Sequence, residues 1–272
     1  MIEGFINAVS VCGPGLEGWR HSRPILAGQQ QYAWRETLPT APSILPPNER
    51  RRVGAAVRLA LTIAQQAHDM AGLAPGSIGS VFATSNGDGA VMHAMLETLA
   101  AGEPVSPTRF HNSVHNAAAG YWSIATGSQQ LASCLAGHDA TPAAALLKVL
   151  ATVRATQQPQ LLCVYEAPMP PPLDAKRPTV DAFGVGLVLA PKVSETALAR
   201  LSVTYQPGLA AERDALNLTA LQVLARGNPA ARLLPLLEAL ARNVSVTFSL
   251  ALLESSLQVR VQPWSAVNES LN

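Results

Sequence analysis

Residues 133–153 read SCLAGHDATPAAALLKVLATV, and this stretch decides the fold class. From Ala140 to Val153 the only charged residue is Lys148, while leucine and valine occur at positions that point in every direction around a helix. A helix that is apolar all round is buried, whereas a surface helix keeps one polar face. We therefore expect a helix over residues 137–155 that other elements enclose.

The segments around this helix have the pattern of buried strands. Residues 5–11, 78–84, 161–165 and 183–189 are short apolar runs, each bounded by turn-forming residues, and 128–133 is a further candidate strand. Two more helices are expected, one that Asn48 caps and one that follows the turn at residues 86–89 and ends near residue 101. Strands that alternate with helices predict an α/β fold, here a mixed sheet with a buried central helix.

The rest of the chain completes one domain. Residues 16–47 are rich in Pro, Gly and Gln and predict an irregular surface excursion. A strand at 201–205, helices near 209–226 and 230–241, and a β-hairpin formed by 244–250 and 257–261 are expected toward the C-terminus. We interpret residues 1–272 as a single domain, with 193–264 as its C-terminal helical and hairpin extension.

Composition excludes several classes of protein. Hydrophobic residues make up 48% of the chain and charged residues 14%, and the formal net charge is +1 with no basic block, so a nucleic-acid partner is not expected. No apolar run reaches the roughly 18 residues of a membrane span. Glu3 stands where a signal peptide would carry positive charge, and three widely spaced cysteines indicate neither a disulfide framework nor a zinc site, so a reducing cytoplasm is the expected location.

Familiar catalytic signatures are missing from the sequence. It contains no G-x-S-x-G elbow and no Walker A loop, and Gly87-Asp88-Gly89 lacks the third glycine of a dinucleotide fingerprint. His111 and His115 have a spacing that can hold a metal ion on a helix, but no third ligand stands near them. We expect neither a metal nor a cofactor.

Three short motifs nevertheless occur in an order that can be compared with known families. Ser85-Asn-Gly-Asp-Gly89 follows a strand, Asn116-Ala-Ala-Ala-Gly120 comes next, and Ser133-Cys-Leu-Ala-Gly137 leads into the apolar helix. In this order they resemble the N-terminal half of the β-ketoacyl synthases, which have the thiolase fold. In that family a Gly-rich turn, an Asn-x-x-Ala-Gly segment and an Ala-Cys-x-x-Gly elbow follow one another. The resemblance covers roughly residues 1–190 and implies a thiolase-like half-fold.

The departures from that family bear on function. Complete synthases have a second half that contributes two histidines and a lysine to catalysis, but no His or Lys follows Asn217 in this chain. The ending, with its helices and hairpin, resembles the short chain-length-factor subunits of aryl polyene clusters. The resemblance implies a non-catalytic partner of a full-length ketosynthase, with which it forms a heterodimer and through which it meets an acyl carrier protein.

Cys134 leaves two readings open. By the resemblance it stands at the nucleophile position, where the N-terminus of the buried helix stabilises a thiolate. A nucleophile without a base or oxyanion donors does little, and cysteine is often simply buried, so a packed thiol is the other reading. His138 and Asp139 diverge on a helix and are interpreted as first-turn residues, with Asp139 favourable to the dipole.

The resemblance also implies a tunnel and an interface. The helix after the Gly-rich turn would lie beside the acyl pocket, so we predict that Met92, Met95, Leu99, Phe110 and Val114 line a tunnel, although ordinary core positions have the same spacing. The strand before the elbow would pair with the partner, which predicts interface residues Ser128, Gln129, Gln130, Leu131 and Asn116.

The sequence therefore predicts a chain-length factor that shapes the tunnel for polyene or fatty-acid-like elongation. Two alternatives stay open: an acyltransferase that acts through Cys134, and a purely structural stabiliser of a synthase complex.

Overall fold

The computed structural model describes residues 1–37, 39, 42–74, 76–208 and 216–264. Within these ranges a nine-stranded sheet runs in the order β4-β3-β5-β6-β1-β7-β9-β8, with β2 paired to β1 off this path. Strand β3 is parallel to β4 and β5, and the other pairs are antiparallel. The strands are β1 Ile2–Gly13, β2 Leu16–Glu17, β3 Gly79–Ala83, β4 Ala132–Leu135, β5 Gln160–Glu166, β6 Phe183–Ala190, β7 Ala199–Gln206, β8 Val246–Leu252 and β9 Ser255–Pro263.

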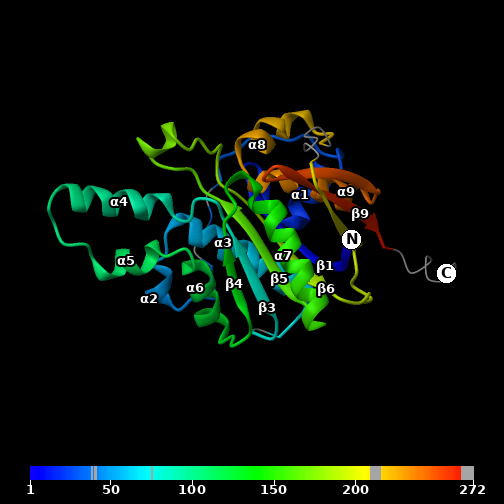
Figure 1. Cartoon of the computed structure of the whole chain (residues 1–272), viewed down its shortest axis with the longest axis horizontal. Coiled ribbons are helices and arrows are strands. Elements are labelled where there is room, and N and C mark those ends of the chain that lie inside the picture. The colour runs from blue at the N-terminus through cyan, green and yellow to red at the C-terminus, as the bar shows by residue number, and fades with distance from the viewer. Residues whose placement is uncertain (38, 40–41, 75, 209–215, 265–272) are drawn as a thin grey trace.

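Helices cover both faces of this sheet (Figure 1). α3 packs on β1, β5 and β6 from one side, and α7 packs on β1, β3 and β5 from the other. The helices are α1 Trp19–Leu26, α2 Pro47–Arg50, α3 Ala55–Ala71, α4 Gly89–Ala100, α5 Pro107–Ser113, α6 Ala117–Thr126, α7 Thr141–Thr156, α8 Gln222–Gly227 and α9 Leu234–Arg242, with 3-10 turns η1 His138–Ala140, η2 Leu173–Ala175, η3 Thr219–Leu221 and η4 Ala230–Leu233.

The mixed α/β fold and its buried central helix are confirmed. Side chains that alternate along the strands enter two separate cores, so that Val81 belongs to the core under α7 and Phe82 to the core under α3. Lys148 stays exposed on the outer face of α7, while most other side chains of that helix are buried. The helix begins later than expected, because η1 precedes it.

The long helix expected after Asn48 is present as α3, but its predicted start and its cap at Asn48 are wrong. Two helices stand there, α2 and α3, and Pro46 and Gly54 occupy their N-cap positions. Asn48 accepts a hydrogen bond from Arg51 instead. The carboxylate of Asp88 lies so close to Gly54 that a Cβ there would collide with it. The segment that carries Asp88 therefore occupies the space that a continuous helix through residue 54 would need.

The expected strand at 128–133 is also misplaced, because β4 begins at Ala132. Ser128 N–H donates to Thr126 Oγ1, and Gln130 N–H donates to Ser128 Oγ. Such local bonds to hydroxyl groups hold a turn in place of a strand. The segment before it contains two helices, α5 and α6.

The C-terminal extension continues the sheet, since β7 pairs with residues 2–6 of β1. The predicted hairpin is confirmed as β8 and β9. Of the helix expected near 209–226, residues 209–215 lie outside the described residues, and α8 covers only its end. The supposedly irregular stretch 16–47 contains α1, whose pattern Pro24 in its interior concealed.

Candidate functional site

Helices α4 and α5 form an arm that projects from the body of the molecule (Figure 1). Asp88 caps α4 by accepting the N–H of Val91. Gly89 is the only buried residue of α4 and Asn112 the only one of α5. The arm therefore touches the body at its base, and its length is held by contacts between its own helices.

Large apolar side chains are exposed to solvent along this arm. Met92, Leu96, Leu99, Phe110 and Val114 are each between 40% and 62% exposed. Met95 is half-buried. None of the predicted tunnel residues is therefore buried in the core of this chain, and several exposed large apolar side chains on two neighbouring helices indicate a candidate site of interaction. Leu96 was missed, although its spacing to Met92 and Leu99 is helical.

Strand β4 is an open edge of the sheet; it contacts α6, which in turn contacts α5 of the arm. Leu131 and Leu135 accept N–H bonds from β3 through their carbonyl groups, so the alternate residues Ala132 and Cys134 present their main-chain groups outward. Leu131 and Ile124 each expose 56% of their surface next to the edge. An uncovered edge strand is a template for pairing with another chain.

The other predicted interface residues surround this edge. Gln129 and Gln130 are exposed and Ser128 is half-buried in the turn that precedes β4. Asn116 is exposed at the N-cap of α6.

Cys134 lies in β4, and its side chain packs against the core under α3. Burial raises the pKa of its thiol, and a hydrogen bond from the Ala119 N–H offsets only part of that rise. The buried helix starts later along the chain than we expected, since α7 begins at Thr141, and the N–H that bonds the sulfur belongs to the first turn of α6. The sulfur is therefore a protonated, partly packed thiol at neutral pH.

A polar network that sequence reasoning missed surrounds Asp139. Arg177 and Arg232 bind its two carboxylate oxygens at 2.7 and 2.9 Å. Burial raises the pKa of Asp139, but the two guanidinium groups outweigh that effect and hold it below its usual value. Asp139 lies in the first turn of η1, which leads directly into α7, so the expected first-turn position is found in a 3-10 turn. His138 beside it is exposed and has a positive φ.

The network continues to the base of the arm. Arg177 donates to Ser85 Oγ and Asn86 Oδ1, both at 3.1 Å. The fully buried Glu166 at the end of β5 accepts the N–H of Ser85 and the hydroxyl of Thr84. Burial raises the pKa of Glu166, although these bonds and Arg177 oppose the rise. One set of contacts thus joins the arm base to the C-terminal extension.

The two histidines considered as a metal pair have other contacts. His115 Nε2 lies 3.0 Å from the carbonyl of Thr84, and His111 meets the Tyr121 ring edge-on. No cluster of three potential metal ligands occurs among the residues that the structure describes. Within the same ranges, no helix combines the length and hydropathy needed to cross a bilayer.

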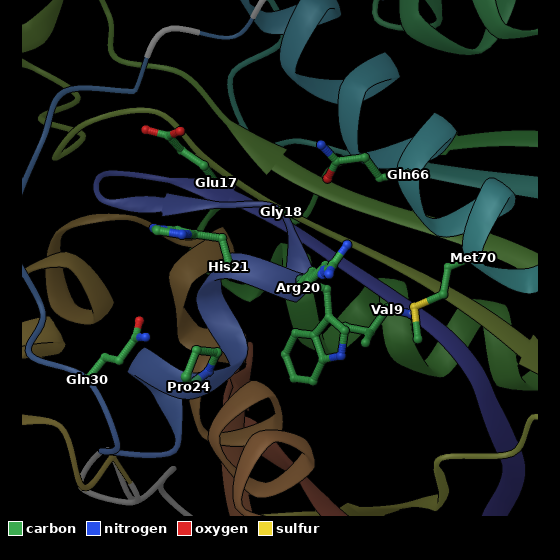
Figure 2. A pocket seen from close by; sticks show the side chains of 10 residues that line it. Val9, Glu17, Gly18, Arg20, His21, Pro24, Gln30, Gln66 and Met70 are labelled. Carbon is green, nitrogen blue, oxygen red and sulfur yellow. The ribbon is translucent and has the colours of Figure 1, made fainter.

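A groove of about 780 Å³ lies between α1 and the C-terminal half of α3 (Figure 2). Trp19, Arg20 and His21 line it from α1, and Gln66 and Met70 line it from α3. It adjoins the end of α3 remote from the arm, so it is separate from the apolar surface described above.

Comparison with known proteins identifies the family of this chain. The chain matches the family model described as the β-ketoacyl synthase N-terminal domain over residues 26–252. No curated protein sequence matches it.

Solved structures of low identity share the fold. A chain of the ketosynthase (ApeO) in complex with its chain length factor (ApeC) from Xenorhabdus doucetiae is 18% identical, with a TM-score of 0.72 over 95% of this chain and 99% of that chain. A β-ketoacyl synthase from Burkholderia phymatum STM815 is 11% identical, with a TM-score of 0.70 over 97% and 100%. The ishigamide ketosynthase/chain length factor is 14% identical, with a TM-score of 0.69 over 96% and 99%.

Proposed function

Because the chain belongs to the family of β-ketoacyl synthase N-terminal domains, we propose that it is the non-catalytic partner of a full-length ketosynthase. In this role it is a chain-length factor that shapes the acyl tunnel during polyene or fatty-acid-like elongation, in a heterodimer that an acyl carrier protein visits. The observations that carry the proposal are the exposed apolar side chains of the arm and the open edge of β4, since each is suited to contact with a protein partner.

The state of Cys134 supports a non-catalytic role. Condensation requires a thiolate, and burial keeps this sulfur protonated. The sequence supplies no His or Lys after Asn217 to act as base or oxyanion donor. The partner would therefore contribute the nucleophile, and this chain would contribute one wall of the acyl tunnel.

The arm supports the tunnel role. Met92 and Leu99 lie bare on α4, and Phe110 and Val114 lie bare at α5. Methionine is unbranched and polarisable, so it adapts to acyl chains of different shape. In the complex these side chains would be covered by the partner and by the growing chain.

The central experiment compares the lone chain with the complex. Incubated with acyl- and malonyl-carrier protein, the lone chain should give no ketoacyl product above a Cys134→Ala control by mass spectrometry. The complex with a co-expressed ketosynthase should give product. Turnover by the lone chain that Cys134→Ala removes would favour the acyltransferase alternative, and a complex whose product never depends on this chain's arm would favour a structural stabiliser.

A second experiment tests the edge. Ala132→Pro removes an outward N–H from β4 and should abolish co-purification with the ketosynthase, because the new strand pair loses a donor. Ala132→Val is the matched control, since it changes the same position but keeps the main-chain N–H. Equal recovery of both complexes would exclude β4 as the interface.

A further inference from the structure

Both ends of the arm are fastened to one short segment, Arg52–Ala56, at the start of α3. At the first end, the Asp88 carboxylate lies against the backbone of Gly54. At the second end, the buried Asn112 donates its side-chain amide to the carbonyl of Arg52 at 2.8 Å. The arm is thus attached at two points.

The attachment at Asp88 is electrostatic. One oxygen of Asp88 accepts the N–H of Val91 and caps α4, while the other is buried without a hydrogen bond of its own. Burial raises the pKa of Asp88, and the N–H groups of Val91, Ala56 and Ala90 and the charge of Arg58 oppose that rise. One carboxylate therefore faces the positive ends of two helices, α4 and α3.

The attachment at Asn112 is a chain of hydrogen bonds. Tyr121 O–H donates to Asn112 Oδ1 at 2.8 Å, which fixes the orientation of the amide that binds Arg52. Within the arm, Arg109 of α5 donates to Thr98 of α4 at 3.1 Å. The two helices are therefore tied to each other as well as to the body.

We propose that Asp88 and Asn112 are positioning residues that together set the angle at which the arm leaves the body. One attachment would leave a hinge, whereas two attachments to the same short segment fix a direction. The binding consequence rests on the proposed function: a pre-set arm loses little conformational entropy when the ketosynthase covers it, so the two residues preorganise the interface.

Hydrogen exchange of the isolated chain tests this without a partner. If α4 and α5 move together, each substitution should speed amide exchange in both helices by about 10-fold, as expected for local opening. Asp88→Ala should therefore affect α5 as well as α4, and Asn112→Ala should affect α4 as well as α5. Peptides from β5 and β6 should not change. Faster exchange confined to the helix that carries the substitution, or no change at all, would overturn the proposal.

Conservative variants keep the test decisive if an alanine variant does not fold. Asp88→Asn retains an N-cap for α4 but loses the charge that faces α3, so α5 should still open while the first turn of α4 stays protected. Tyr121→Phe should loosen both helices to a smaller extent. Asp174→Asn, at an exposed turn of similar chemistry, is the control and should change nothing in the arm.

Binding to a co-expressed ketosynthase tests the consequence separately. Asp88→Asn should weaken association by roughly 10-fold, since an unfixed arm must be ordered on binding. Altered exchange with unaltered affinity would support the positioning role of Asp88. It would also show that the arm is not part of the interface, which would contradict the proposed function. Unaltered exchange with a formed complex would instead overturn the positioning role alone.

Discussion

Cys134, which the resemblance to the family puts at the nucleophile position, lies in a setting that does not favour the thiolate. Burial raises the pKa of its thiol more than the N–H of Ala119, in the first turn of α6, lowers it. We predict that Cys134→Ala in the assembled complex keeps most of the condensing activity, measured as product formed per complex. A loss of about 100-fold, equivalent to about 2.7 kcal/mol, would instead make this cysteine the working nucleophile.

Asp139 gives a prediction about acid. Its folded pKa is lowered, so it stabilises the fold above its unfolded pKa of about 3.9, and this stabilisation is lost as pH falls toward the folded value. Asp139→Asn should therefore lower the urea midpoint at neutral pH, and the gap to the wild type should close as the pH falls below about 4.

Asp174→Asn is the control for this experiment, because Asp174 is exposed and bonds only within its own turn. If the difference in urea midpoint between the wild type and Asp139→Asn stays constant across the pH range, the charge of the Asp139 carboxylate does not account for its stabilising contacts with Arg177 and Arg232.

Sequence reasoning found Cys134 but not the network around Asp139. The cysteine belongs to a motif that is contiguous along the chain. Arg177 and Arg232 lie far from Asp139 in sequence, in a Pro-rich loop and in η4, and only the fold brings them together. Neither arginine stands in a pattern that single-sequence reasoning could have connected with Asp139.

At the scale of elements, the arm gives a prediction about product length. If these residues line the proposed tunnel, Met92→Trp and Met95→Trp should shorten the chains that the complex releases, because a larger side chain would fill the end of the tunnel, and the complex should stay assembled. Val223→Trp is the control, since Val223 is 70% exposed on α8, outside the arm. Products of unchanged length from folded, assembled variants would remove the tunnel role.

The elements themselves were predictable where the pattern is local. The turn at 86–89 and the helix after it are confirmed, because Asp88 is a strong N-cap before an apolar run. The break between α2 and α3 was not predictable, since it depends on Asp88 packing against Gly54 from a distant segment. The start of β4 was missed because the hydroxyl of Ser128 competes for the backbone.

At the scale of the whole molecule, the C-terminal extension shares the sheet with the rest of the chain. β7 pairs with β1, and α9 packs against α1. We predict a single thermal transition in which the calorimetric and van't Hoff enthalpies agree, as for one cooperative unit. A second transition, removed by truncation after residue 192, would instead show that residues 193–264 fold independently.

The bare arm also has a consequence for protein dosage in the cell. An apolar surface of this kind on a lone subunit is what chaperones and proteases recognise on incomplete assemblies. Copies made in excess of the partner would be orphan subunits and would be degraded or held by chaperones. We therefore expect the steady-state amount of this chain to follow the amount of ketosynthase, whatever the rate at which its own messenger is translated.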